Sequence, residues 1–356
     1  MPHNIAIICI TKNGIKIARS IKANIPDAII YAQVKHSDSK SDIIWFETPA
    51  ALLIADIFKK YEALICIFSL GAVIRLISKL VSDKKYDPAV LVIDDQANYV
   101  ISALSGHLGG ANSMAIRISE ILNCQSVITT AADVNKTISV DLLGREFGWL
   151  IENFENVTKV SAHMVNEDKV GIFQDTGELN WWNAKELPKN VTLVKKIEDL
   201  TSKEFKACLI ITDKILHEKN LIEKSVIYRP KSLVVGLGLH WDITELEISN
   251  GIKRVLDDKG LSIMSIKSIA TIQKNVLPNA LELFTDKNKI QLQLFDRNTL
   301  NKIKVPSPSD IVKKFEGTSS VAEAASICGS NGDLIVVKQK IPPKLTVAVS
   351  RLKYDN

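Results

Sequence analysis

The sequence predicts an α/β protein with an N-terminal domain on a mostly parallel sheet, a small middle domain and a second α/β domain at the C-terminus. Short apolar runs rich in β-branched residues alternate with amphipathic stretches over residues 1–150 and again after residue 230, which is typical of βαβ units. Turn residues bound these runs, as expected for strands covered on both faces of a sheet. The 356 residues, 46% apolar and 24% charged, suit a globular chain of roughly two to three domains.

The N-terminal α/β domain is predicted over residues 1–150. Its expected strands are residues 5–10, 28–32, 64–68, 90–93, 99–103 and 127–130. Its expected helices are residues 14–23, 48–60, 72–80 and 110–122, followed by a closing helix around 139–148. A turn at 94–97 separates the fourth and fifth strands.

The middle domain, residues 151–229, has a weaker pattern because charged segments interrupt it, and only 208–211 reads clearly as a strand. Residues 228–231 are interpreted as a linker, since the residue before a proline is pushed out of helical geometry. The C-terminal α/β domain, residues 230–356, restarts the βα rhythm. Its expected strands are 233–239, 290–295, 334–338 and 345–350, and its expected helices are 244–256, 278–284, 309–315 and 319–328. The segment around 266–272 is not assigned to either type.

Composition excludes several classes of protein. The 45 basic and 40 acidic residues leave a net charge of +5, which is too small to indicate nucleic-acid binding but would tolerate a polyanionic small molecule. The longest apolar stretch, residues 63–74, is too short to span a membrane as a helix. No basic segment precedes the N-terminal apolar run, so no secretory signal is expected. The absence of such a signal predicts a cytoplasmic location, where structural disulfides are not expected. The five cysteines form no Cys-x-x-Cys pair, so we expect no cysteine zinc site.

The most informative stretch is DDQANYVISALSGHLGGAN, residues 94–112, which places three glycines and His107 between a strand and a helix. Backbone amides at a helix N-terminus favour anionic groups, and glycines let a ligand approach the backbone closely. On such a loop His107 could exchange a proton near neutral pH. The alternative is a loop histidine that hydrogen-bonds a carbonyl between turn glycines.

Two further strand ends are expected at the same rim, because ligands of open α/β sheets bind outside the carboxyl ends of the strands. Residues 69–75, SLGAVIR, place Arg75 one turn into a helix. Residues 129–133, TTAAD, end a strand in two hydroxyls and the carboxylate of Asp133. The alternatives are a surface ion pair for Arg75 and a capping role for Asp133.

Other motifs are weaker. Gly236-Leu237-Gly238 follows a strand like the start of a dinucleotide fingerprint, but Trp241 stands where the third glycine should be, so NAD binding is not predicted. The sequence contains no Walker A motif, no His-Glu-x-x-His and no Gly-x-Ser-x-Gly. The remaining histidines, His240 among them, are expected to be surface or structural residues.

Residues 71–141 resemble the CbiG family of cobalamin biosynthesis, the cobalt-precorrin-5A hydrolases, through SGHLGGAN spaced before TTAAD and then VDLL. The C-terminal part is similar to the family's last domain through VVGLG, PSPSDIV and GTSSVAEAA, while the middle domain is uninformative. The family's last domain usually begins with Gly-x-Gly-Cys followed by basic residues, where this chain has Leu239, His240 and Trp241 after the second glycine. Lys274 is kept, but no acidic residue follows it shortly after.

The resemblance implies an enzyme that opens the δ-lactone of cobalt-precorrin-5A and releases acetaldehyde to give cobalt-precorrin-5B. Opening an ester needs an activated water and a stabilised oxyanion. On that basis His107 is the expected base or proton carrier, oriented by Asp133 or Asp95, and amides near Gly109 and Gly110 are the expected oxyanion donors. The expected substrate-binding residues are Gly71, Arg75, Ser105, Gly106, Gly109, Gly110, Asn112, Thr129 and Thr130.

The resemblance also sets the expected ligands. No cofactor and no protein-bound metal are expected, because cobalt arrives with the substrate. The expected partner is a small-molecule tetrapyrrole, with no nucleic acid and no membrane, and other cobalamin-pathway enzymes or a second copy of the chain are further candidates. The alternative function is a non-catalytic carrier of corrinoid intermediates, which the same loops would serve. A third interpretation, a nucleotide or sugar-phosphate enzyme, requires saturable binding of a phosphate ligand.

Overall fold

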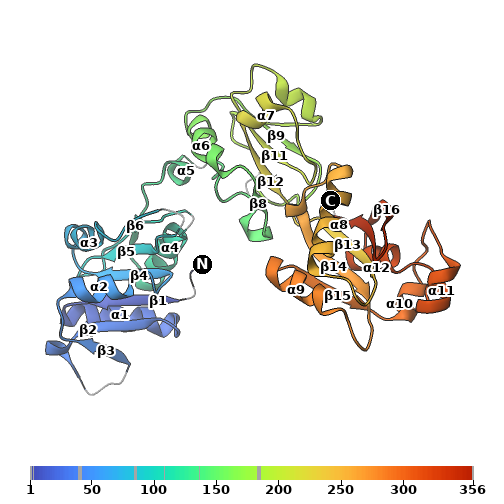
Figure 1. Cartoon of the computed structure of the whole chain (residues 1–356). Coiled ribbons are helices and arrows are strands. Elements are labelled where there is room, and N and C mark those ends of the chain that lie inside the picture. Colours follow the sequence, from blue (N-terminus) through green and yellow to red (C-terminus); the bar gives the residue numbers. More distant parts are fainter. Residues whose placement is uncertain are drawn as a thin grey trace. The chain divides into compact units, whose positions relative to one another are not determined.

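The computed structural model describes residues 2, 4–38, 42–83, 86–107, 109–135, 137–182 and 186–354, without the side chains of residues 133, 134 and 311. The chain forms two compact units, Met1–Leu142 and Leu143–Asn356. The first unit holds one sheet and the second holds two (Figure 1). The predicted α/β class is confirmed, while the domain boundaries predicted near residues 150 and 229 stay predictions.

The sheet of the first unit has the strand order β3-β2-β1-β4-β5-β6-β7. Its strands are β1 (Ile5–Cys9), β2 (Ile29–Gln33), β3 (Ile43–Phe46), β4 (Ala63–Ile67), β5 (Ala89–Ile93), β6 (Tyr99–Leu104) and β7 (Gln125–Val127). Every neighbouring pair is parallel except β5 with β6. The connection between β5 and β6 is a short turn, and a parallel pair would need a crossover of a dozen or more residues. The chain therefore reverses direction at β6.

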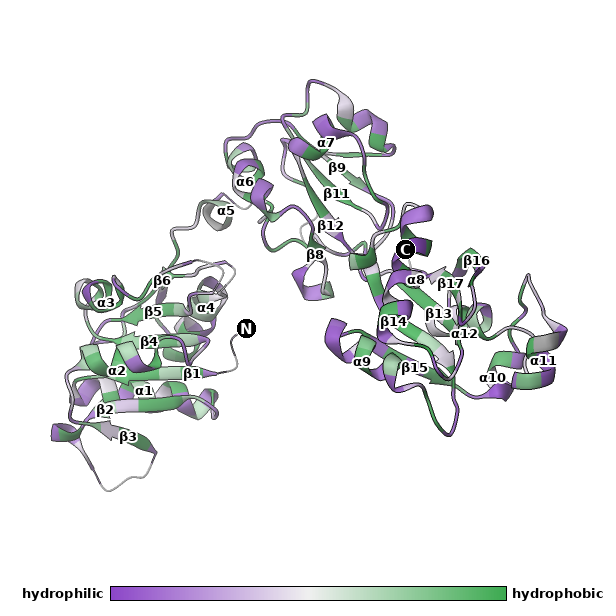
Figure 2. Cartoon of the chain, in the orientation of Figure 1, coloured by the Kyte–Doolittle hydropathy of each residue, from purple (hydrophilic) through white to green (hydrophobic). Residues whose placement is uncertain are grey.

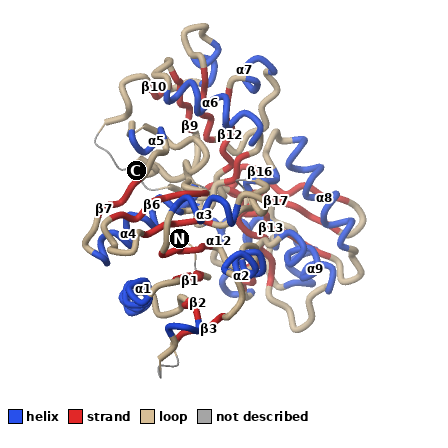
Figure 3. The backbone as a smooth tube through the Cα atoms, turned by 90° about the vertical axis from the view of Figure 1, so that its left-hand side faces the viewer, coloured by secondary structure: helices blue, strands red, loops and turns tan. Residues whose placement is uncertain are grey.

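Helices cover both faces of this sheet. One face carries α1 (Lys12–Asn24) and α4 (Ala111–Leu122), and the other carries α2 (Ala50–Ile57) and α3 (Leu70–Ile77). In β1, Ile5 and Ile7 pack with the first pair of helices, and Ala6 and Ile8 with the second, because successive side chains of a strand point to opposite faces. Figure 2 shows the resulting hydrophobic strands, and Figure 3 shows the helices around them.

Three predictions for the first unit need correction. The strand β3 was not predicted, and β7 ends before Thr129 and Thr130. A closing helix at 139–148 was wrong, because the segment forms turns and one 3₁₀ turn, Arg145–Phe147. Gly144 and Gly148 flank that turn with φ values of +73° and +76°. This left-handed backbone interrupts a helix.

The second unit begins with a sheet of order β10-β9-β11-β12-β8. Its strands are β8 (Leu150–Ile151), β9 (Val170–Gln174), β10 (Val191–Val194), β11 (Ala207–Ile211) and β12 (Ser225–Arg229), with helices α6 (Val157–Val165) and α7 (Lys219–Glu223). Of these strands only β11 was predicted. Interpreting residues 228–231 as a linker was wrong, because Tyr228 and Arg229 are fully buried in β12. The Arg229 guanidinium donates to Glu152 and to the carbonyls of Thr212 and Lys214.

The last sheet has the order β15-β14-β13-β17-β16. Its strands are β13 (Leu233–Leu239), β14 (Ile266–Ile272), β15 (Gln291–Phe295), β16 (Asp333–Ile341) and β17 (Leu345–Arg351). One face carries α8 (Glu245–Asp258) and α9 (Asn279–Asn288), and the other carries α10 (Arg297–Asn301), α11 (Asp310–Glu316) and α12 (Val321–Ser330). The strands β13, β14 and β15 are parallel, and β17 runs antiparallel to β13 and β16. All strands predicted after residue 230 are present.

Asp213 ties the last two sheets together. It follows β11, and its fully buried carboxylate accepts two hydrogen bonds from Arg351 in β17, both at 2.7 Å. Ser232, just before β13, donates to the same carboxylate at 2.8 Å. A charge-assisted bidentate pair of this kind fixes both distance and orientation.

We expect Asp213→Ala to lower the free energy of unfolding by about 3 kcal/mol, because the largely buried Arg351 guanidinium loses its partner. The matched control is Glu204→Ala, which removes the exposed partner of Lys169 at 2.6 Å and should cost about 0.5 kcal/mol or less. Urea titrations followed by circular dichroism measure both losses. Equal losses for the two variants would contradict a special role for the Asp213 pair.

Candidate functional site

His107 and Asp141 form a pair at one edge of the N-terminal sheet. His107 lies in the loop between β6 and α4, and its Nδ1 is 3.2 Å from Asp141 Oδ1. The two side chains are only 15% and 14% exposed. At this distance the carboxylate of Asp141 stabilises a protonated His107 ring. A histidine beside a carboxylate can exchange a proton with water near neutral pH.

Asp95 was predicted to orient His107, and the structure shows that this is wrong. Asp95 lies in the turn after β5, where Thr11 donates to its carboxylate and Asn13 to its carbonyl. That turn is at the carboxyl end of β5, whereas β6 carries the chain back before His107 is reached. The side chain of Asp133, the other predicted partner, lies outside the described residues.

Residues 69–75 also lie at the edge of the sheet away from His107. They follow the carboxyl end of β4, which is parallel to β5, and a five-residue strand separates the two edges by about 16 Å. Arg75 donates to the carbonyl of Gly71 in its own helix at 3.1 Å. The expected convergence of Gly71 and Arg75 with the His107 loop is therefore wrong.

Thr129 and Thr130 lie at the same edge as His107, because they follow β7 and β7 is parallel to β6. Asn112 joins this segment to the start of α4. Its buried Nδ2 donates to Thr130 Oγ1 at 2.9 Å, and its Oδ1 accepts from Ser102 at 2.7 Å. A Cβ on Gly106 would lie 2.6 Å from Asn112 Oδ1. Asn112 and Gly106 thus shape the loop that holds His107.

Backbone carbonyls of the His107 loop accept hydrogen bonds from the amides at the N-terminus of α4. Three amides donate at 3.0–3.2 Å: Gly110 to His107, Ala111 to Ser105, and Asn112 to Gly106. The amide of Gly110 thus donates within the loop, and its expected role as an oxyanion donor stays a prediction. Gly110 has φ +84°, and a Cβ on Gly109 would lie 2.7 Å from the Ser105 carbonyl. Ser105 donates through Oγ to the Asp87 carbonyl at 3.0 Å. The glycines are explained by packing within the loop.

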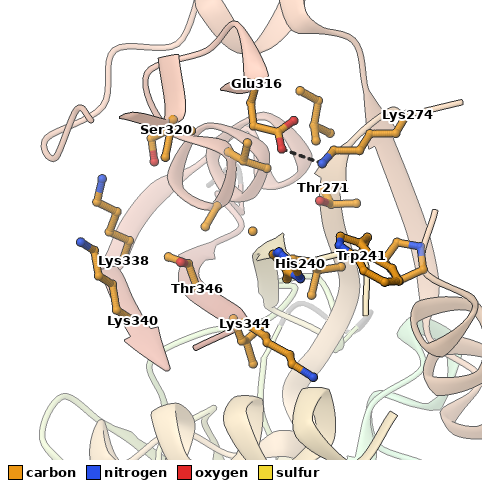
Figure 4. A pocket seen from close by; sticks show the side chains of 18 of the residues that line it. His240, Trp241, Thr271, Lys274, Glu316, Ser320, Lys338, Lys340, Lys344 and Thr346 are labelled. Carbon is orange, nitrogen blue, oxygen red and sulfur yellow. Dashed lines mark hydrogen bonds and ion pairs between the residues drawn. The ribbon is translucent and has the colours of Figure 1, made fainter. Parts of the chain in front are cut away.

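A second candidate site is a cavity of about 590 Å³ in the C-terminal sheet domain (Figure 4). It lies at the carboxyl ends of β13 and β14, beside the start of α12 and the connection between β16 and β17. Open α/β sheets bind ligands at this position. The polar lining residues are His240, Thr271, Lys274, Ser309, Glu316, Ser320, Lys338, Lys340, Lys344 and Thr346. His240, expected to be a surface or structural residue, therefore lines a cavity.

A network of charges lies beside His240. His240 Nδ1 is 2.5 Å from Asp242 Oδ1, and Lys344 Nζ is 3.2 Å from Asp242 Oδ2 and 3.6 Å from Glu247. The hydrogen bond from His240, followed by the one from Lys344, lowers the pKa of Asp242. The hydrogen bond to Asp242 raises the pKa of Lys344. The aspartate and lysine are therefore both ionised at neutral pH.

Lys274 gains an acidic partner that its sequence neighbours do not provide. Its Nζ lies 2.6 Å from Oε1 of Glu316, at the end of α11 (Figure 4). In the family pattern an acidic residue follows the lysine within a few positions. Here the acidic partner of Lys274 is 42 positions further along the chain and is brought to it by the fold.

The described residues contain no group of three or more His, Cys, Asp or Glu side chains that could hold a metal ion. Among the same residues, every helix is too short or too polar to cross a membrane.

Three family models match the chain in order. Residues 52–133 match Cobalamin synthesis G N-terminal, residues 138–230 match Cobalamin biosynthesis central region, and residues 233–350 match Cobalamin synthesis G C-terminus. The first match includes His107 and the third includes the residues around the cavity.

Named relatives cover nearly the whole chain. The chain is 36% identical to a cobalt-precorrin-5A hydrolase of Priestia megaterium, over 98% of this chain and 95% of that protein. It is 27% identical to a cobalt-precorrin-5A hydrolase of Salmonella typhimurium, over 94% of both chains. The crystal structure of a cobalamin biosynthesis protein G homolog from Sulfolobus solfataricus is 24% identical, with a TM-score of 0.38, over 99% of this chain and 98% of that one.

Proposed function

The chain belongs to the CbiG family of cobalamin biosynthesis, and on this premise we propose that it is a cobalt-precorrin-5A hydrolase. The observation that carries the proposal is the 36% identity to a hydrolase of that name over almost the full length of both proteins. The substrate is then a tetrapyrrole that brings its own cobalt, and the protein needs no cofactor of its own. We also propose that the enzyme acts in the cytosol, which agrees with five cysteines that all carry free thiols.

The His107–Asp141 pair supports a role in activating water. Nε2 of His107 accepts a proton from water, and the resulting hydroxide adds to the lactone carbonyl. Asp141 holds the ring in the required tautomer and stabilises the imidazolium that forms, as carboxylates do beside catalytic histidines. Both side chains are mostly shielded from solvent, and an ion pair is stronger in such surroundings than in water.

The reaction then balances with one water molecule. Collapse of the tetrahedral intermediate breaks the ring C–O bond, which leaves a carboxylic acid and an alkoxide on the carbon that bears the methyl group. The carboxylic acid loses its proton to solvent. The alkoxide forms acetaldehyde as its C–C bond to the macrocycle breaks, and the electron pair stays in the macrocycle. The proton held at Nε2 of His107 can return to the product, so that the histidine ends each turnover neutral.

We expect the purified protein, supplied with cobalt-precorrin-5A without oxygen, to release one acetaldehyde for each substrate consumed. In heavy-oxygen water the label should enter the new carboxylate, because water attacks the lactone carbonyl. A heat-inactivated sample is the control, and aldehyde is measured as its hydrazone. Substrate binding without aldehyde would support the carrier alternative, and saturable binding of a phosphate ligand would support a sugar-phosphate or nucleotide enzyme. Partner enzymes or a second copy of the chain remain predictions.

A further inference from the structure

The C-terminal cavity has an unusually exposed apolar wall. Trp241 is 79% exposed and Val276 is 83% exposed, and both line the cavity together with Leu277 and Pro278. The His240 ring lies against Trp241, with 5.9 Å between the ring centroids, and the hydrogen bond of His240 to Asp242 fixes its position. Large exposed apolar surface that is rimmed by polar groups marks a binding site. A flat, partly apolar ligand would bury this surface.

The cations that line the cavity divide into two groups. Lys274 and Lys344 are neutralised by the carboxylates of Glu316, and of Asp242 and Glu247. Lys338 donates to the neutral carbonyl of Ser307, and Lys340 makes no side-chain hydrogen bond or ion pair with the described residues. Two positive charges on β16 are therefore available to an anionic ligand.

These two charges lie across the cavity from the apolar wall. Figure 4 shows Lys338 and Lys340 on one side and His240 and Trp241 on the other. Lys338 and Lys340 lie two positions apart near the end of β16. A ligand that contacts both sides must be broad, apolar in its middle and negatively charged at its edge.

The cavity lacks the glycine-rich turn of a dinucleotide site, because β13 is followed by the bulky His240 and Trp241. The start of α12 also lines the cavity, and the amides of a helix N-terminus favour a carboxylate as well as a phosphate. The two lysines come from β16, a different element. Separate carboxylates around the edge of a ring can contact both elements together, which matches the arrangement better than a single compact phosphate.

We infer that this cavity is a binding site for the carboxylate-rich tetrapyrrole, with the macrocycle against Trp241 and peripheral carboxylates on Lys338 and Lys340. The inference rests on the proposed function for the class of ligand. It concerns the unit Leu143–Asn356 taken by itself. The cavity binds the macrocycle, and no proton transfer is assigned to it.

The test uses the full chain and uroporphyrin, an octacarboxylated tetrapyrrole, as the probe, with binding measured by porphyrin fluorescence anisotropy. We expect Lys340→Glu to weaken binding about tenfold, since it replaces an attraction by a repulsion at a partly exposed site. Trp241→Ala should weaken binding about tenfold through loss of stacking. The matched control is Lys267→Glu, which makes the same charge change at the amino end of β14 and should alter affinity less than twofold.

The binding measurements test the cavity independently of the acetaldehyde assay, which tests the proposed function. Equal effects of Lys340→Glu and Lys267→Glu, or no effect of Trp241→Ala, would overturn the cavity as the binding site even if the wild type releases acetaldehyde. Selective loss of binding in the two cavity variants would uphold the inference even if no acetaldehyde is found. Circular dichroism melting of every variant shows whether a loss of binding reflects unfolding. Lys340 is an exposed residue of the edge strand β16, so its variant is expected to fold.

Discussion

Replacing His107 with glutamine should lower the single-turnover rate of acetaldehyde release by about 10² to 10⁴, while substrate affinity changes less than about tenfold. Glutamine can still hydrogen-bond to Asp141, so the loop should keep its shape, but an amide cannot accept a proton from water at neutral pH. Rapid-quench measurement of aldehyde with enzyme in excess over substrate isolates the chemical step. Asp141→Asn should also slow this step, because the neutral amide no longer fixes the productive tautomer of His107.

Two other His–Asp pairs of the chain provide matched controls. His163 Nδ1 lies 2.9 Å from Asp168 in the middle sheet domain, and His240 pairs with Asp242 beside the cavity. His163→Gln should leave both rate and affinity near the wild-type values. His240→Gln should weaken substrate binding and keep most of the rate at saturation. If His107→Gln turns over within about threefold of wild type, or if His240→Gln is the slower variant, His107 is not the base.

Which residues of the N-terminal site could be predicted depends on the direction of the strand that precedes each of them. The sequence identified the His107 loop and the threonines after β7, and the structure brings Thr130 to that loop through Asn112. Arg75 and Asp95 were expected near the His107 loop because, within a mostly parallel sheet, the strand before His107 was not assigned the opposite direction. The short turn at 94–97 indicates that the strands on either side of it are antiparallel, because a parallel pair needs a much longer connection.

Asp141 could not have been chosen from the sequence as the partner of His107. It is 34 positions away and lies in turns where a helix was expected.

The role of the loop glycines could not be predicted either, because glycines needed for ligand approach and glycines needed for packing look alike in a sequence. At Gly106 and Gly109 it is the neighbouring Asn112 and Ser105 that leave no room for a Cβ.

The C-terminal sheet was predictable and the middle sheet was not, for a physical reason. In the C-terminal domain β13 is a seven-residue run of apolar residues and glycines, all but one of the seven residues of β14 are buried, and each predicted strand has a counterpart. The middle strands β8 and β10 have only two and four residues, and β10 has two exposed positions. Such short strands owe their pairing to neighbours distant in sequence, which periodicity does not reveal.

The two glycines of the GLG segment of β13 differ in whether the structure leaves room for a side chain. A Cβ on Gly236 would lie 1.9 Å from the carbonyl oxygen of Ala322 and 2.8 Å from the amide nitrogen of Ser326, both in the backbone of α12. A Cβ on Gly238 would meet nothing closer than the Cβ of Thr346 at 3.5 Å, which is ordinary contact. The first glycine is therefore required by helix-on-strand packing, and a dinucleotide is not needed to explain it.

Gly236→Ala should therefore lower the free energy of unfolding by about 3 kcal/mol or more, because a buried helix backbone cannot yield to the new methyl group at small cost. Gly238→Ala should change it by less than about 1 kcal/mol, since alanine fits the space and restricts the unfolded chain. Urea unfolding followed by circular dichroism measures the midpoint of each variant. Recovery of soluble protein for Gly238→Ala but not for Gly236→Ala would point in the same direction. Equal midpoints for the two variants would mean that α12 moves away from β13 easily, and the cavity wall formed by Val321 and Ala322 would then be far less rigid than its packing indicates.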